Sequence, residues 1–179
     1  MPDVVLVNEQ DEQIGTMEKM EAHHQPHLHR AFSIFLFNNQ NEMLLQRRAL
    51  TKYHSGGLWT NACCSHPYPG EAVADAANRR LHEELGISTP LQKAFDFTYQ
   101  AEFENGLYEH EFDHVFIGHF DGTPTPDPEE VEDYCYKTIA EIKRDLENIP
   151  GAYTPWFIIA LPHLEKYLQS KASITLEAV

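Results

Sequence analysis

The sequence predicts an α+β fold in which helices are layered against a β-sheet. Two strand-like pairs, each joined by a polar turn, flank an amphipathic helical segment, and an apolar helical segment lies near the end of the chain. Strands and helices with this pattern bury their apolar faces by packing in layers. A length of 179 residues is enough for a sizeable core. We therefore expect residues 1–179 to form a single domain.

Three regions have the apolar, β-branched and aromatic composition of strands. A first strand is predicted at Val4–Val7. A hairpin is predicted where a run of Asn and Gln separates Phe32–Phe37 from Met43–Arg48. A second pair of strands is predicted at Phe95–Phe103 and Tyr108–Phe120, across a short turn that contains glycine.

A helix is predicted at Val73–Leu85, because its apolar residues recur at the spacing of one helical face. Gly86 follows, where a left-handed C-terminal cap is expected. The apolar face consists of Val73, Ala76, Ala77, Leu81 and Leu85.

The C-terminal third of the chain is predicted to be a loop followed by two helices. Asp121–Asp133 is rich in proline and acidic residues, which favours an exposed loop. Thr138–Glu147 and Pro155–Gln169 are predicted helices, and Pro162 is expected to kink the second of them.

The charge and the cysteine content exclude several classes of function. A formal net charge of −15 argues against nucleic acid or an anionic membrane as a partner, because both require basic patches. A small phosphate ligand needs only a local cluster of basic residues. Three cysteines form no disulfide framework, and the N-terminus lacks the features of a signal peptide. These features predict a cytoplasmic protein.

The stretch from Thr60 to Gly86 gathers residue types that carry chemistry. The thiol of Cys64 lies two residues before the imidazole of His66, and the predicted helix ends with the acidic pair Glu83 and Glu84. Two adjacent carboxylates beside a histidine suit a hard cation such as Mg²⁺. The same residues could instead form exposed ion pairs with arginines on the helix.

A second group of histidines lies near the N-terminus, and its residues are His23, His24, His27 and His29. This tract is either a surface feature or part of a metal site. Alternation along a strand would turn Glu109 and Glu111 to the same face, where two carboxylates are costly unless they are solvated or bind a cation. Three imidazoles and two carboxylates would suit Zn²⁺, Mn²⁺ or Mg²⁺.

The segment from Ser65 to Ile87 resembles the Nudix box, G-x5-E-x7-R-E-U-x-E-E-x-G-U, in which U is apolar. The chain differs at two positions, because Ser65 replaces the leading glycine and Arg80 replaces the glutamate that follows the first arginine. Nudix hydrolases use that glutamate for metal binding or catalysis. The replacement therefore argues against hydrolysis of a diphosphate.

The residues before the box resemble one branch of these proteins, the type I isopentenyl-diphosphate isomerases. That branch has the motif T-N-x-x-C-x-H-P, which matches Thr60–Pro67. The resemblance covers Val4 to Leu168. It implies a Nudix fold with a mixed sheet between flanking helices (an α/β/α arrangement) and a Nudix core at residues 29–160. The implied activity moves a double bond in a C5 prenyl diphosphate, as part of isoprenoid biosynthesis.

The resemblance also implies a set of site residues. The family binds a divalent ion with three histidines and two glutamates, and the first histidine is either His23 or His24. A Mg²⁺ bound by Glu84 would bridge to the diphosphate. The larger metal site would contain Mn²⁺, Zn²⁺ or Mg²⁺, and its ligands would be His23, His29, His66, Glu109 and Glu111. The implied catalytic residues are Cys64, Glu111, Tyr99 and Trp156. The implied diphosphate-binding residues are Lys19, Arg48, Lys52 and Arg80.

Two other functions remain open at the level of the sequence. A Nudix-type diphosphate hydrolase would retain the fold but would leave Cys64 and Trp156 unexplained. A metal-binding or nucleotide-binding module without catalysis would not need Cys64, Glu111, Tyr99 and Trp156 together. The expected partner is a small prenyl diphosphate, and the expected state is a monomer or weak homodimer.

Overall fold

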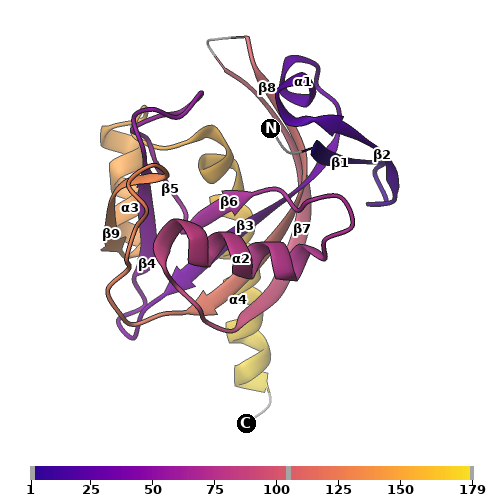
Figure 1. Ribbon diagram of the computed structural model, residues 1–179. Helices are drawn as coiled ribbons and strands as arrows, with labels where there is room; N and C mark the ends of the chain where they lie inside the picture. The colour runs from indigo at the N-terminus through magenta and orange to yellow at the C-terminus, as the bar shows by residue number, and fades with distance from the viewer. Residues whose placement is uncertain (1–2, 104–105, 178–179) are drawn as a thin grey trace.

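The computed structural model describes residues 3–103 and 106–177 (Figure 1). Within these ranges the chain forms four helices and nine strands, and the strands belong to one sheet. The strands are β1 (Asp3–Val7), β2 (Gln13–Glu18), β3 (His29–Phe37), β4 (Met43–Arg48), β5 (Trp59–Thr60), β6 (Cys63–Ser65), β7 (Leu91–Glu102), β8 (Tyr108–His119) and β9 (Val131–Lys137). The helices are α1 (Lys19–His24), α2 (Val73–Leu85), α3 (Ile139–Asn148) and α4 (Pro155–Glu177).

Strand β3 lies at the centre of the sheet. It pairs in parallel with β8, from His29 opposite Glu111 to Phe37 opposite His119. Along its other edge it pairs antiparallel with β6, where Ser33 lies opposite Cys64. The mixed pairing therefore brings the Cys64 segment and the acidic part of β8 to the two edges of one strand.

The two faces of the sheet are covered by different helices, as Figure 1 shows for α2 and α4. Side chains of β3 alternate between the faces, as expected of a strand. Ile34 and Leu36 pack in the core cluster that contains Leu81 of α2, whereas Phe35 packs in the cluster that contains Phe157 of α4. This helix–sheet–helix arrangement confirms the predicted α+β class.

Helix α2 has the bounds that its apolar periodicity predicts. Ala76, Ala77, Leu81 and Leu85 are buried, and Gly86 ends the helix with φ of 66°. A Cβ atom at position 86 would also lie 3.0 Å from Cβ of Thr125, so both the backbone angle and the neighbouring loop favour glycine.

The first predicted hairpin is only partly right. Strands β3 and β4 pair at the turn, where Phe37 lies opposite Met43, and then diverge. Strand β4 instead pairs along its length with β9. The predicted loop at Asp121–Asp133 gives way to β9 at Val131, so this strand was missed. Its side chains are mostly polar or aromatic and its partner is far away in the sequence, so local periodicity did not identify it.

The second predicted pair of strands is present as β7 and β8, which pair from Leu91 opposite Gly118 to Glu102 opposite Tyr108. Two residues of the predicted turn, Glu104 and Asn105, lie outside the described residues. The long hairpin places Tyr99 directly opposite Glu111. This register brings the hydroxyl of Tyr99 within hydrogen-bond distance of the Glu111 carboxylate.

Both C-terminal helices were predicted. Thr138 caps α3 through a reciprocal capping box with Glu141, and Pro162 lies inside α4. Among residues 3–103 and 106–177, no helix has both the length and the apolar character needed to cross a bilayer.

Candidate active site

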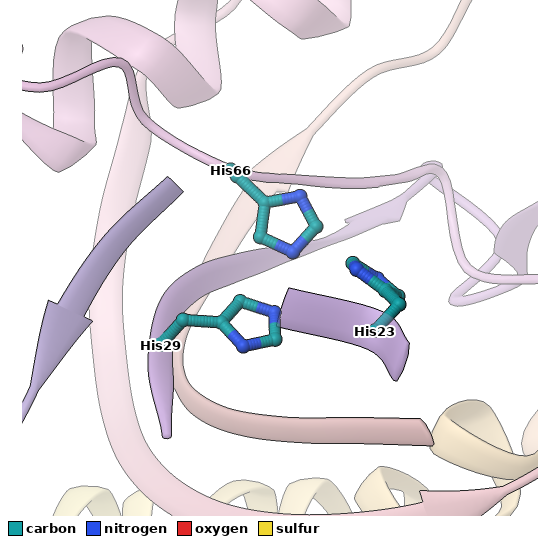
Figure 2. Close-up of side chains that lie close together, drawn as sticks. All are labelled: His23, His29 and His66. Atoms are coloured by element: carbon teal, nitrogen blue, oxygen red, sulfur yellow. The ribbon is translucent and has the colours of Figure 1, made fainter. Parts of the chain in front are cut away.

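Three imidazoles from separate parts of the chain meet at the end of the sheet where β3 begins (Figure 2). His23 comes from α1, His29 from the first position of β3, and His66 from the segment after β6. Their ring centroids are 5.0–5.8 Å apart. His23 is completely buried whereas His24 is exposed, so the first imidazole of this cluster is His23.

The rings of His23 and His29 are oriented by the backbone. Nδ1 of His23 lies 2.6 Å from the carbonyl oxygen of Lys19, and Nδ1 of His29 lies 2.8 Å from that of His27. Nδ1 must carry the proton to donate these bonds, which leaves a lone pair on each Nε2. Both Nε2 atoms are buried and have no hydrogen-bond partner among the residues that the structure describes, and the same is true of Nδ1 of His66.

Two buried carboxylates complete the cluster. Oε1 of Glu111 lies 2.8 Å from Nε2 of His66 and 3.6 Å from Nε2 of His29, and Oε1 of Glu109 lies 3.9 Å from Nε2 of His23. The hydroxyl of Tyr99 donates to both carboxylates, at 2.9 Å to Glu109 and 2.6 Å to Glu111. The predicted alternation along β8 is therefore right, since Glu109 and Glu111 share one face.

The imidazoles of the cluster differ in their electrostatics. Burial lowers the pKa of His23, whereas at His29 the contact with Glu111 outweighs burial and raises the pKa. Burial lowers the pKa of His66 to about 3, although its contact with Glu111 opposes this shift. Burial alone would raise the pKa of Glu111, but the neighbouring imidazoles of His29 and His66 outweigh it and hold this pKa well below its usual value. A neutral imidazole beside an ionised carboxylate is the form that binds a cation.

The donor set fits a divalent transition ion. One nitrogen from each of His23, His29 and His66 can be chosen so that all three lie within 4.8 Å of one another. Buried imidazole nitrogens without partners, next to ionised carboxylates, are the ligands that Zn²⁺ and Mn²⁺ accept. The residues present thus suit the metal that the sequence pattern predicts.

The thiol of Cys64 lies at the edge of the same site. Its Sγ atom donates to Oδ1 of Asn61 at 2.9 Å and lies 3.5 Å from Oγ of Ser33, which in turn donates to Asp113 at 2.7 Å. Burial raises the pKa of the Cys64 thiol, and the charge of Asp113 adds to this effect. Both effects favour the protonated thiol and make it a weaker acid than a free cysteine.

Trp156 forms an aromatic wall of the site. It is buried, and its Nε1 donates to Oγ1 of Thr60 at 3.0 Å, which fixes the plane of the ring. The guanidinium of Arg48 lies 5.1 Å from the centroid of this ring. This ring can therefore attract positive charge on its π face.

Basic residues surround the opening of the site and are paired with acidic ones. Arg80 contacts Glu84 at 2.6 Å and Glu130 at 3.1 Å, and Lys52 also contacts Glu130. Nε2 of Gln46 donates to Glu84 at 2.9 Å. These pairs hold the basic side chains at fixed positions.

Nearly all the predicted site residues line one cavity. His23 and His29 are completely buried and pack against His66, which lines the cavity. The predicted residues that line the cavity are Lys19, Arg48, Lys52, Cys64, His66, Arg80, Glu84, Tyr99, Glu109, Glu111 and Trp156.

Several residues at the site were not identified from the sequence. Glu130 and Gln46 hold the basic side chains and Glu84, and Asn61 and Ser33 hold the thiol. His54 lines the cavity as well. Asn61 lies within the motif that includes Cys64, which is a signal that could have been used, whereas Glu130 lies in a region read only as a loop.

Comparisons with known proteins agree with this geometry. The profile of the NUDIX domain family matches residues 27–157. Isopentenyl-diphosphate Delta-isomerase 2 of Aromatoleum aromaticum is 50% identical over 158 residues, which cover 88% of this chain and 84% of the relative. The isopentenyl-diphosphate Delta-isomerase of Pectobacterium atrosepticum is 46% identical over 95% of both chains.

Solved structures support the fold. A crystal structure from Deinococcus radiodurans superposes with a TM-score of 0.66 at 23% identity, over 85% of this chain and 99% of the other. The MutT protein from Methanosarcina mazei superposes with a TM-score of 0.63 at 16% identity, over 80% of this chain and 95% of the other. At these identities the likeness concerns the fold alone.

Proposed function

This chain belongs to the isopentenyl-diphosphate Delta-isomerase family of NUDIX-domain proteins, and from that premise we propose that it interconverts isopentenyl diphosphate and dimethylallyl diphosphate. The observation that best supports this function is the presence of a thiol and a carboxylate in the same cavity. Cys64 and Glu111 line one cavity, which basic residues also line. A proton can therefore be added and removed next to a bound diphosphate.

The reaction moves a double bond by one carbon. The electron pair of the C3=C4 double bond takes a proton at C4, which leaves a tertiary cation at C3. Loss of a proton from C2 then returns an electron pair to form C2=C3. In our proposal one of Cys64 and Glu111 donates the first proton and the other accepts the second. Tyr99 holds Glu111 through its 2.6 Å hydrogen bond and so orients the carboxylate in the cavity.

The cation at C3 must be stabilised and kept away from water. We propose that the π face of Trp156 does this, which contributes about 0.5–2 kcal/mol. The ring is held by its hydrogen bond to Thr60 and is only 4% exposed, so it keeps water away from the cation on this side of the cavity. Water that reached the cation would convert it to an alcohol.

The diphosphate is proposed to bind to Lys19, Arg48, Lys52 and Arg80. Arginine forms bidentate contacts with phosphate oxygens, and a diphosphate carries more charge than a carboxylate. In the free enzyme Glu130 pairs with Lys52 and Arg80. We propose that this carboxylate gives way when substrate binds, and that Glu84 would then hold a Mg²⁺ ion, which would neutralise part of the charge of the diphosphate.

We propose that the ligands of the second ion are His23, His29, His66, Glu109 and Glu111. When Mn²⁺, Zn²⁺ or Mg²⁺ is bound, it supplies positive charge beside the active site. The chain's own residues orient Glu111 and exclude water.

We also propose that the protein acts in the cytoplasm as a monomer or weak homodimer, in isoprenoid biosynthesis. Its free cysteines fit a reducing compartment.

Product analysis tests the proposed reaction directly. Incubation with isopentenyl diphosphate, Mg²⁺ and Mn²⁺ is expected to give the allylic isomer and no free phosphate. Phosphate release would indicate a hydrolase. Metal binding without any change in the substrate would indicate a binding module. Either of these two results would overturn the proposal.

Metal removal is expected to abolish turnover. Stripping with a strong chelator empties the proposed histidine site, and Mg²⁺ alone is expected to restore only part of the activity, because imidazole nitrogens hold transition ions more firmly than Mg²⁺. Activity and bound metal should be measured in parallel, with Mn²⁺ and Zn²⁺ added back separately. Full activity in protein shown to be free of metal would contradict the prediction.

Arg80→Glu is expected to weaken diphosphate binding without creating a hydrolase. The substitution replaces a cation with an anion at the opening of the site, so KM should rise by about 10–100-fold, the equivalent of one lost charged hydrogen bond. Arg144→Glu makes the same charge change at an exposed position on α3 and serves as the control. An unchanged KM for the Arg80 variant would show that this residue does not contact phosphate.

A further inference from the structure

One imidazole at the site has no role in the function proposed above. His54 lies in the turn region between β4 and β5 and is only 6% exposed. Its ring stacks on Phe103, with centroids 4.5 Å apart, and contacts Tyr53 and Trp156 edge-on. Aromatic packing on three sides therefore fixes where the two ring nitrogens point.

The nitrogens of His54 are arranged like those of His23. Nδ1 of His54 lies 3.3 Å from the hydroxyl of Ser55. Its Nε2 is buried, has no hydrogen-bond partner within residues 3–103 and 106–177, and lies 3.3 Å from Oε1 of Glu109. In His23, too, Nδ1 has a partner and Nε2 has none. Such an arrangement is typical of imidazoles that bind metals, in which the second nitrogen is held by an outer partner.

His54 forms a second group of potential ligands, together with His23 and Glu109. One ligand atom from each of the three lies within 4.8 Å of the other two. This group shares His23 with the cluster of His23, His29 and His66. Because Nδ1 of His23 is engaged by the carbonyl of Lys19, this residue has one nitrogen left and can bind only one ion. The two groups therefore cannot each bind an ion of their own through His23.

We propose that His54 is a fourth imidazole ligand of the ion bound by His23, His29, His66, Glu109 and Glu111. This inference rests on the metal site of the proposed function. Four imidazole nitrogens and two carboxylate oxygens form a six-donor shell made entirely by protein. A closed shell leaves no position for water or substrate, in contrast to catalytic zinc sites, which keep one open. The ion then orients Glu111 but activates no water.

A different role for His54 would be to donate a hydrogen bond to Glu109 from outside the shell. The two roles require opposite states of one atom, because a ligand has a bare Nε2 and a hydrogen-bond donor has a protonated Nε2. The protonation of His54 Nε2 in the metal-loaded protein therefore decides between them.

Long-range ¹H–¹⁵N correlation spectra of the ¹⁵N-labelled full chain, recorded with and without Zn²⁺, provide this test. His54 is expected to show a protonated Nδ1 and a zinc-bound Nε2 that shifts with His23, His29 and His66. A protonated Nε2 in the zinc-loaded protein would overturn the inference. The experiment uses the unsubstituted chain, so the result does not depend on whether a variant folds.

Competition with a chelator gives an independent measure. His54→Ala is expected to lower Zn²⁺ affinity at least tenfold, whereas His24→Ala, which removes the exposed neighbour of His23, should leave it unchanged. Equal affinities of His54→Ala and the unsubstituted chain would also overturn the inference. Failure of the unsubstituted chain to bind Zn²⁺ would instead reject the proposed metal site, and the product assay tests the isomerase activity separately.

Discussion

Cys64→Ala is expected to abolish isomerisation while the fold and the metal content stay near normal. The substitution removes one of the two groups proposed to move protons, and such groups contribute about 10²–10⁴-fold to the rate. Alanine fits the space of the thiol without a new clash. Initial rates of isomer formation, together with metal analysis and circular dichroism, check the three parts of this expectation.

Cys63→Ala is the matched control, because adjacent residues of β6 face opposite sides of the sheet. Cys63 is fully buried in the cluster beneath α2, whereas Cys64 packs on the other face and lines the cavity. Loss of the Cys63 side chain should cost about 1 kcal/mol of unfolding free energy and retain turnover. An active Cys64→Ala protein beside an inactive, folded Cys63→Ala protein would contradict the assignment of the thiol.

An alkylating substrate analogue provides a second check on the same assignment. An epoxide that carries the diphosphate is expected to label Cys64 or Glu111, and peptide mapping locates the label. Label on Cys63 would again contradict the assignment.

Local patterns in the sequence predicted those parts of the site that lie within one element. The apolar spacing of α2 gave its bounds and its cap at Gly86. Alternation predicted that Glu109 and Glu111 share a face. Each of these inferences depends only on the period of a helix or strand, which is fixed by backbone geometry.

Contacts between distant segments were harder to predict. Strand β9 pairs with β4 although Met43 and its partner Lys137 are 94 positions apart in the sequence, and the polar residues around its start indicated a loop. Glu130 contacts Lys52 and Arg80 only because this pairing brings them together. No local period encodes such a contact, so the carboxylate was not identified as part of the site.

His54 illustrates the same limit for a single side chain. It stands alone between a tyrosine and a serine, without the spacing of a metal-binding motif. Its position beside Glu109 results from the packing of its ring on Phe103 and Trp156. Phe103 directly follows β7 and Trp156 lies in α4, so both are distant from His54 in the sequence. The resemblance to known proteins named the other ligands but not this one.

Glu111→Gln is expected to lower the rate of isomerisation by about 10³–10⁴-fold, even when the metal site is saturated. Glutamine has the shape of glutamate but cannot accept a proton at neutral pH, so the second acid–base group of the proposed reaction is lost. The variant also removes the charge that contacts His66 at 2.8 Å, so metal affinity should fall as well. Rates measured over a range of Mn²⁺ concentrations separate these two effects.

Glu109→Gln is the matched control for this prediction. Glu109 lies two residues earlier on the same strand face, accepts a hydrogen bond from the same Tyr99 hydroxyl and belongs to the same proposed set of ligands, but it has no proposed part in proton transfer. Excess Mn²⁺ should therefore restore most of the activity of Glu109→Gln and almost none of that of Glu111→Gln. If excess metal restored both variants equally, Glu111 would be only a ligand, and one of the two protons would have to pass through another residue of the cavity.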